Sequence, residues 1–343
     1  MRAERTVAPA YRPGAAQLLA METAMKTILV PLDGSALAEE VLPYVRMLAP
    51  VLGAEIRLLH VVSEIDTHNP LAYDITTLYS MGDVIAAQQE RYQQSWQTMR
   101  QHAEGYLASQ AMRLKEDGLD VAIDVRFGSP AEVIVEVAEK KHVALVTMAT
   151  HGYSGLRRWA LGSVTDRVVQ AGPAPVFVVR GGAVDAANPP TLKHILVPLD
   201  GSELARQALP LAAELASCAR AELLLLQAIA PPLDAHAGQR PLARPPMDME
   251  ESQAMLQEHA TVEVGEQAQA LRRRDLAVRT IVLNGHAAEV IVDEATREQA
   301  DLIVMATHGR GGLRRWALGS VADKVLHATA TPLVLVRAQE SAT

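Results

Sequence analysis

The sequence predicts an α/β protein built from two doubly wound parallel sheets in tandem, each of five strands. Short apolar runs alternate with amphipathic helical segments in the order βαβαβαβαβ, which is typical of a parallel sheet with helices on both faces. The whole pattern occurs twice along the chain. The length of 343 residues suits two domains of roughly 150 residues each, and each of these can bury its own core.

The elements of the first half follow in order. The first strand ends in an Asp-Gly-Ser turn, where Ser35 can cap a helix that continues through Ala38, Val41, Leu42 and Val45. The second strand is followed by a long irregular connection and then by a long polar-faced helix. The expected strands are 27–32, 54–62, 120–127, 143–149 and 176–179, and the expected later helices are 82–117, 131–141 and one that opens at 163.

The second half repeats the first. The segment HILVPLDGSELA from His194 matches TILVPLDGSALA from Thr27, and both halves contain LRRWALGSV. A repeat of this length indicates a duplicated domain. We therefore expect a flexible extension at 1–24, a first domain at 25–181, a linker rich in Gly, Ala and Pro at 182–191, a second domain at 192–338 and a short tail at 339–343.

Composition argues against several classes of protein. The net charge of −8 argues against nonspecific binding of nucleic acid, which needs clustered surplus Lys and Arg. Cys218 is the single cysteine, so neither an intrachain disulfide nor a cysteine-based zinc site is expected. Apolar runs are shorter than the roughly 18 residues of a membrane-spanning helix, and the first 24 residues lack a signal-peptide pattern. We expect a cytoplasmic protein without a membrane partner.

Three features recur in register in the two halves, and all follow strands or open a helix. They are an Asp after the first strand (Asp33, Asp200), a Gly turn after the fourth (Gly152, Gly309) and a Gly-Ser pair at the last helix (Gly162-Ser163, Gly319-Ser320). In a doubly wound sheet the carboxyl ends of the first and fourth strands meet at the switch in strand order, where ligands bind. Free amides at a helix N-terminus favour an anion, so the pattern suits a nucleotide.

Structural explanations of the same residues remain open. Each Asp can instead stabilise an Asx-type turn, and each Ser can be a helix N-cap. Each Gly can serve a turn that requires positive φ, where the functional explanation is a close approach of the backbone to a ligand. His151 and His308 stand beside no recognisable nucleophile or carboxylate partner and are better explained as turn residues. The chain contains no P-loop motif, and we assign no catalytic residue and no metal ligand.

The last strand of each half is expected to pair with its counterpart. Val176–Val179 and Leu333–Val336 are fully apolar, and an exposed apolar edge strand invites pairing. Pairing of these two strands would produce a pseudo-twofold arrangement of the domains. It would bury Phe177 and Leu335 between them.

These residues resemble the universal stress protein family in a tandem form, over 25–181 and 192–338. The family's ATP-binding branch carries the loop G-x2-G-x9-G-[ST], whose second and third glycines match Gly152 and Gly162, and Gly309 and Gly319. The first glycine is replaced by Ala149 and Ala306. The resemblance implies Rossmann-like domains similar to adenine nucleotide alpha hydrolases, with strand order 3-2-1-4-5.

The resemblance also implies site residues and a function. Asp33 and Asp200 would hold ribose, and the backbone around Val61 and Ala228 would meet adenine. The phosphates of ATP, with or without Mg²⁺, would contact Gly152, Gly162, Ser163, Val164, Gly309, Gly319, Ser320 and Val321. We expect a regulatory stress-response factor that binds ATP in one or both domains, can form a homodimer and acts on an unidentified protein partner. The alternatives are a nucleotide-independent family member, favoured by Ala149 and Ala306, and a slow ATPase.

Overall fold

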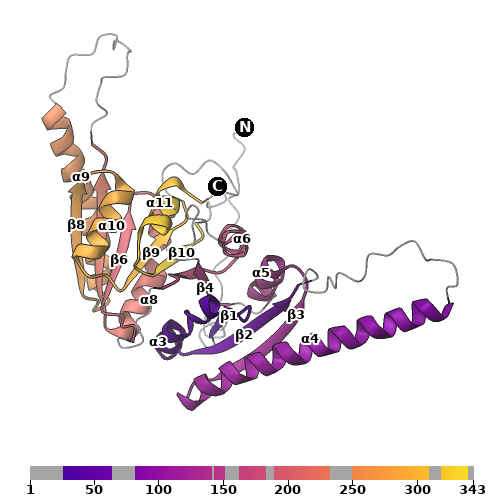
Figure 1. Cartoon of the computed structure of the whole chain (residues 1–343). Helices are drawn as coiled ribbons and strands as arrows, with labels where there is room; N and C mark the ends of the chain where they lie inside the picture. The colour runs from indigo at the N-terminus through magenta and orange to yellow at the C-terminus, as the bar shows by residue number, and fades with distance from the viewer. Residues whose placement is uncertain are drawn as a thin grey trace, which may run out of the picture.

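The structure is a computed structural model of the chain, and it describes residues 26–63, 82–140, 143–150, 162–182, 189–231, 249–308 and 318–338 (Figure 1). For residues 82–93 and 249–250 it describes the backbone alone. The expected extension at 1–24 and the tail at 339–343 lie outside the described residues. So do most of the linker at 182–191 and the two Arg-Trp segments, 157–159 and 314–316.

Ten strands form one sheet in the order β3-β2-β1-β4-β5-β10-β9-β6-β7-β8. Every neighbouring pair within a half is parallel, and each half has the order 3-2-1-4-5, which confirms the predicted fold class. The strands of the first half are β1 (Lys26–Pro31), β2 (Ala54–Val62), β3 (Val121–Phe127), β4 (Leu145–Thr150) and β5 (Val176–Arg180). Those of the second half are β6 (His194–Leu199), β7 (Glu222–Ile229), β8 (Val278–Asn284), β9 (Leu302–Ala306) and β10 (Leu333–Val336).

Helices cover both faces of the sheet. Buried residues on one face form a core with α2 (Ala36–Glu39), α3 (Leu42–Leu52), α4 (Gly82–Glu116), α7 (Glu203–Arg206), α8 (Leu209–Ala219) and α9 (Met249–Arg272). Buried residues on the other face pack with α5 (Pro130–Lys140), α6 (Ser163–Ala171), α10 (Ala287–Arg297) and α11 (Ser320–Ala328). Each of the two cores contains residues of both halves, so the apolar interior is continuous from one half to the other.

The helix expected after Ser35 is divided into two. Ser35 caps α2 as predicted, because its hydroxyl accepts a hydrogen bond from the Ala38 amide at 3.1 Å. The predicted continuation through Val41 is wrong, since α2 ends at Glu39 and α3 begins at Leu42. Pro43 lacks an amide proton and is tolerated only in the first turn of a helix, so a new helix starts there. Pro210 at the start of α8 has the same effect in the second half.

The two halves are joined through their last strands, as predicted. β5 and β10 pair antiparallel, with Phe177 opposite Val334. Phe177 is 0% exposed and Leu335 is 1% exposed, so both are buried as expected, although they belong to the cores of opposite sheet faces. The Phe177 ring packs on Tyr44 of α3, with 5.5 Å between centroids.

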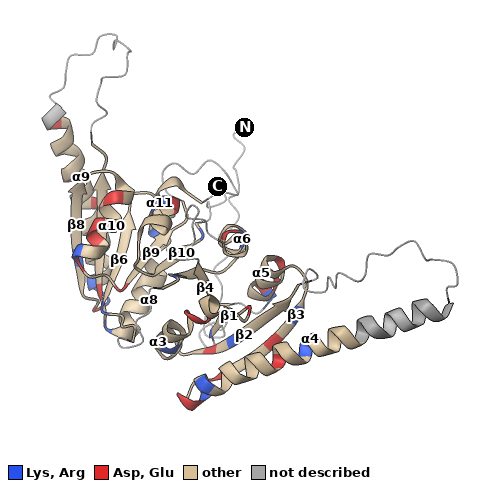
Figure 2. Ribbon diagram, in the orientation of Figure 1, with Lys and Arg blue, Asp and Glu red and all other residues tan. Residues whose placement is uncertain are grey.

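Acidic and basic residues occur close to one another along the ribbon, for example at the end of α4 and around β8 and α10 (Figure 2). On β8, Arg279 donates a hydrogen bond to Glu298 at 2.5 Å, and this bond, with a smaller charge effect from Arg297, lowers the pKa of Glu298. Both outermost strands carry such pairs, since Arg126 on β3 binds Asp124 at 2.8 Å. Charges on an edge strand oppose pairing with another chain.

Candidate functional site

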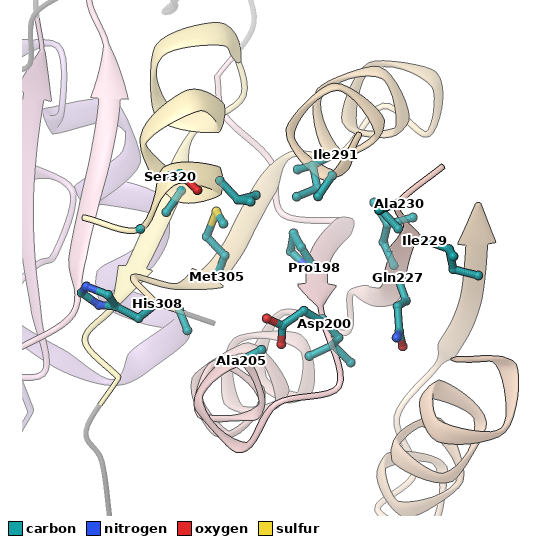
Figure 3. A pocket seen from close by; sticks show the side chains of 18 of the residues that line it. Pro198, Asp200, Ala205, Gln227, Ile229, Ala230, Ile291, Met305, His308 and Ser320 are labelled. Carbon is teal, nitrogen blue, oxygen red and sulfur yellow. The ribbon is translucent and has the colours of Figure 1, made fainter. Parts of the chain in front are cut away.

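A cavity of about 780 Å³ opens at the carboxyl ends of β6, β7 and β9 in the second half (Figure 3). Its wall also includes residues of α7, α9 and α10 and the start of α11. The lining residues with polar side chains are Asp200, Gln227, His259, Thr307, His308 and Ser320, and most of the others are apolar. The site therefore lies where the strand order changes, as expected for a doubly wound sheet.

Five of the six residues predicted as the second-half site line this one cavity. They are Asp200, Ala228, Gly319, Ser320 and Val321. The sixth, Gly309, lies outside the described residues. These five residues come from three segments that are far apart in the sequence, and the parallel strands of the second half bring them together because they end at the same edge.

Asp33 and Asp200 both form Asx turns, the structural role that was expected as the alternative to ligand binding. Oδ1 of Asp200 accepts a hydrogen bond from the Ser202 amide at 2.9 Å and from the Ser202 hydroxyl at 2.6 Å. Oδ1 of Asp33 accepts the equivalent bond from the Ser35 amide at 2.9 Å. In both turns the hydrogen bonds go to Oδ1 of the carboxylate. They hold the carboxylate at the strand end, which is compatible with a role in ligand binding.

The helix that begins at Ser320 has glycine as its N-cap. Gly319 occupies the cap position with φ −61°, and no side chain caps the helix. The interpretation of Ser163 and Ser320 as N-caps is therefore wrong: Gly162 is the corresponding cap in the first half, and both serines are exposed first residues of their helices. Ser320 and Val321, the first residues of α11, line the cavity, and the N-cap residue supplies no side-chain hydrogen bond to the helix.

Gly319 is required by a close approach within the protein. A Cβ added at this position would lie 2.7 Å from the carbonyl oxygen of Thr307, and the Gly319 amide donates to that same oxygen at 2.8 Å. Its φ is negative, so positive φ does not explain the glycine. The start of α11 is thereby fixed against the end of β9, which determines where the helix amides point.

Ala306, which replaces the first glycine of the loop pattern, is part of the cavity wall. It is 7% exposed, and Met305 beside it is 5% exposed. His308 also lines the cavity, and its Nδ1 lies 3.1 Å from the hydroxyl of Thr307. Among the described residues, no group of three or more His, Cys, Asp or Glu side chains is arranged to hold a metal ion.

The first half places its equivalent residues at the carboxyl ends of its own strands, which lie at the opposite edge of the sheet because β5 and β10 pair antiparallel. Asp33 follows β1, Val61 lies at the end of β2, and Gly162, Ser163 and Val164 open α6. Gly152 and His151 lie outside the described residues.

Beside this first site, side chains of β2 and α2 contact α4. Nδ1 of His60 lies 2.8 Å from the Leu32 carbonyl oxygen, and its ring packs edge-on to Tyr106. The Tyr106 hydroxyl donates to Glu39 at 3.0 Å, and Gln110 donates to the same oxygen at 2.9 Å. Burial, together with the bond to Glu39, raises the pKa of Tyr106.

In the second half, the short helix α7 and the long helix α9 are also joined by a hydrogen bond, but the short helix supplies the donor and the long helix the acceptor. Arg206 replaces Glu39 at the end of the short helix, and it donates to Glu263 of α9 at 2.8 Å and to the Gly201 carbonyl oxygen at 3.1 Å. At the position of His60 stands Gln227, which lines the cavity. Sequence analysis missed Gln227 and His259. The signal for Gln227 was one amide in the otherwise apolar run LLLLQAI.

A family model for the Universal stress protein family matches residues 25–180 and 191–337. The chain belongs to the universal stress protein family. The two matched segments cover most of the chain, which agrees with the sequence repeat and with the two halves of the sheet. Among the described residues of this universal stress protein, no helix is long and apolar enough to cross a membrane.

Two mycobacterial relatives and one solved structure illustrate the similarity. The universal stress protein Rv2005c of Mycobacterium tuberculosis is 27% identical over 255 residues, which cover 72% of this chain and 81% of that protein. A universal stress protein of Mycolicibacterium smegmatis is 27% identical over 318 residues, 90% of this chain and 96% of that protein. The crystal structure of a universal stress protein from Archaeoglobus fulgidus has a TM-score of 0.62 at 19% identity, over 91% of this chain and 98% of that chain.

Proposed function

We propose that this universal stress protein binds ATP in the cavity of its second domain and acts as a regulatory factor whose contacts with a protein partner depend on occupancy. The observation that carries the proposal is that five residues expected to meet ATP line one cavity. Its volume of about 780 Å³ is in the usual range for a small-molecule site, roughly 300–1,000 Å³. The first domain is a second candidate site, with Asp33, Val61, Gly162, Ser163 and Val164.

Each part of ATP has a chemically suitable partner. The triphosphate suits the positive dipole end of α11, where the amides of Ser320 and Val321 open the helix beside Gly319. The carboxylate of Asp200 can accept hydrogen bonds from ribose hydroxyls. The apolar wall at Ala228 suits a planar base. A Mg²⁺ ion would accompany the phosphates, with water completing its coordination.

Calorimetric titration of MgATP into the full chain and two matched variants tests this proposal. Ala228→Trp fills the cavity of the second domain, and Val61→Trp makes the same change in the first. We expect Ala228→Trp to lower the affinity of the second site by tenfold or more, because the added ring occupies the volume needed by the base. A lack of saturable ATP binding to the unmodified protein, or binding that neither variant alters, would overturn the proposal.

A further inference from the structure

Gln227 is a buried amide whose hydrogen-bonding capacity the described protein does not satisfy. It is 5% exposed, and its Oε1 has no hydrogen-bond partner among the described residues. Buried side-chain amides are normally paired, because an unpaired polar group in the interior destabilises the folded protein. Gln227 also lines the cavity of the second domain, so a ligand there can supply the missing partner.

The position of Gln227 in the cavity indicates which part of a ligand it meets. In Figure 3, Ser320, Asp200 and Gln227 follow one another across the cavity, from the start of α11 to the end of β7. The proposed function places phosphates at Ser320 and ribose at Asp200. The base, which is joined to the ribose on the side away from the phosphates, is then the part that reaches Gln227.

We propose that the amide of Gln227 recognises an adenine edge and makes the second domain selective for adenine nucleotides. This inference rests on the proposed function. The amide offers one acceptor and one donor side by side, and adenine presents its N6 amino donor beside a ring-nitrogen acceptor, so the two groups form a bidentate pair. Rotation of the amide by a half-turn exchanges its two atoms, so it can match the edge in either direction.

The first domain does not have this recognition group. The equivalent His60 already has a protein partner, since its Nδ1 lies 2.8 Å from the Leu32 carbonyl oxygen. Its ring is further held by the edge-on contact with Tyr106, at 6.1 Å between centroids. Base selectivity through a side chain is therefore assigned to the second domain alone.

The test compares ATP with purine riboside triphosphate, which lacks the N6 amino group. Both are titrated by calorimetry into the full chain carrying Val61→Trp, so that only the second site is measured. We expect this protein to prefer ATP on the order of tenfold or more, as for a bidentate amide–adenine pair. Addition of Gln227→Leu should remove the preference, lowering ATP affinity more than analogue affinity, because ATP loses two hydrogen bonds to the amide and the analogue loses only the one to its ring nitrogen. His60→Leu is the matched control and should preserve the preference.

Two results would contradict the role of Gln227. If Gln227→Leu weakens both nucleotides equally, the residue only shapes the cavity. If it lowers the Tm of the ligand-free protein, the amide is bonded within the protein, whereas our proposal expects an unchanged or higher Tm. Absence of all ATP binding would overturn the proposed function and this inference together, while ATP binding with selectivity independent of Gln227 would overturn this inference alone.

Discussion

At the scale of single residues, the two halves differ where the short first helix meets the long helix. In the first domain Glu39 accepts hydrogen bonds from Tyr106 and Gln110. In the second, Arg206 donates to Glu263. The backbone positions are equivalent, so duplication preserved the contact while the direction of hydrogen bonding was reversed. These contacts hold the long helices beside the two candidate sites.

The Tyr106 contact leads to a prediction about alkaline pH. Burial and the bond to Glu39 raise the pKa of Tyr106, so the folded protein keeps this proton to a higher pH than the unfolded chain does. The resulting stabilisation is complete below about pH 10, the ordinary tyrosine value, and is lost as the pH rises through the folded-state pKa. Tyr106→Phe should lower the free energy of unfolding by about 1 kcal/mol at pH 8 and should reduce the alkaline loss of stability.

Urea denaturation between pH 8 and 11.5 measures both effects. Gln110→Leu is the matched control, because it removes the other hydrogen bond to Glu39 without removing a titrating group. It should lower stability by a similar amount at every pH in this range. An alkaline slope that is the same in Tyr106→Phe and in the unmodified protein would contradict the prediction.

At the scale of elements, the helices that begin at the two candidate sites end against the opposite domain. Nη1 of Arg337, after β10, donates to the carbonyl oxygens of Ala171 and Gly172 at the end of α6, at 3.1 and 3.4 Å. Nη1 of Arg180, at the end of β5, donates to the Thr329 carbonyl oxygen after α11 at 3.3 Å. Each domain thus supplies a cation to the negative end of the other domain's helix, where a positive charge is stabilising.

Removal of one of these arginines should destabilise the paired domains. We expect Arg337→Met to lower the free energy of unfolding by about 1.5–3 kcal/mol, because a charged hydrogen bond to partly buried carbonyls is lost. Arg100→Met is the control, since Arg100 makes an exposed pair with Glu104 one turn away and should change stability by less than about 0.5 kcal/mol. Guanidinium denaturation compares the two; equal effects would mean that the contact with α6 contributes nothing specific.

At the scale of the whole molecule, one ten-stranded sheet runs through both domains. β5 and β10 pair at its centre, and the cores on both faces continue through the junction. A side-chain pair between Lys26 of β1 and Glu214 of α8 also joins the halves. The two halves therefore pair with each other through their last strands within one chain.

Phe177 at this junction should be critical for stability. Phe177→Ala would leave a cavity beside Tyr44 and Val334 and should cost about 3–5 kcal/mol, the usual range for a buried Phe. Phe127→Ala is a matched control, because Phe127 is half-buried and packs on Trp96 near the outer edge of the sheet. Guanidinium denaturation should show a clearly smaller loss for this control. A loss of less than 2 kcal/mol for Phe177→Ala would contradict a central role of the junction.

The sequence by itself determined the fold class, the duplication and the residues at the strand ends. Strand β2 has the predicted bounds 54–62, and α4 ends within one residue of its predicted end. These features follow from hydrophobic periodicity and turn residues, and both are encoded by residues that are close together in the sequence. The pairing of β5 with β10 was also predictable, because a strand of four or five apolar residues at a sheet edge must be covered.

Only the tertiary structure decided which residues share a cavity and which contacts cross between the domains. Gln227 and His259 are separated from Ser320 by at least sixty positions in the sequence, and the parallel sheet and α9 bring them to one site. The role of Gly319 depends on its distance to the Thr307 oxygen, and the contacts of Arg180 and Arg337 depend on how the domains pack. Local patterns do not encode such distances, because they are set by the packing of elements that are remote in the chain.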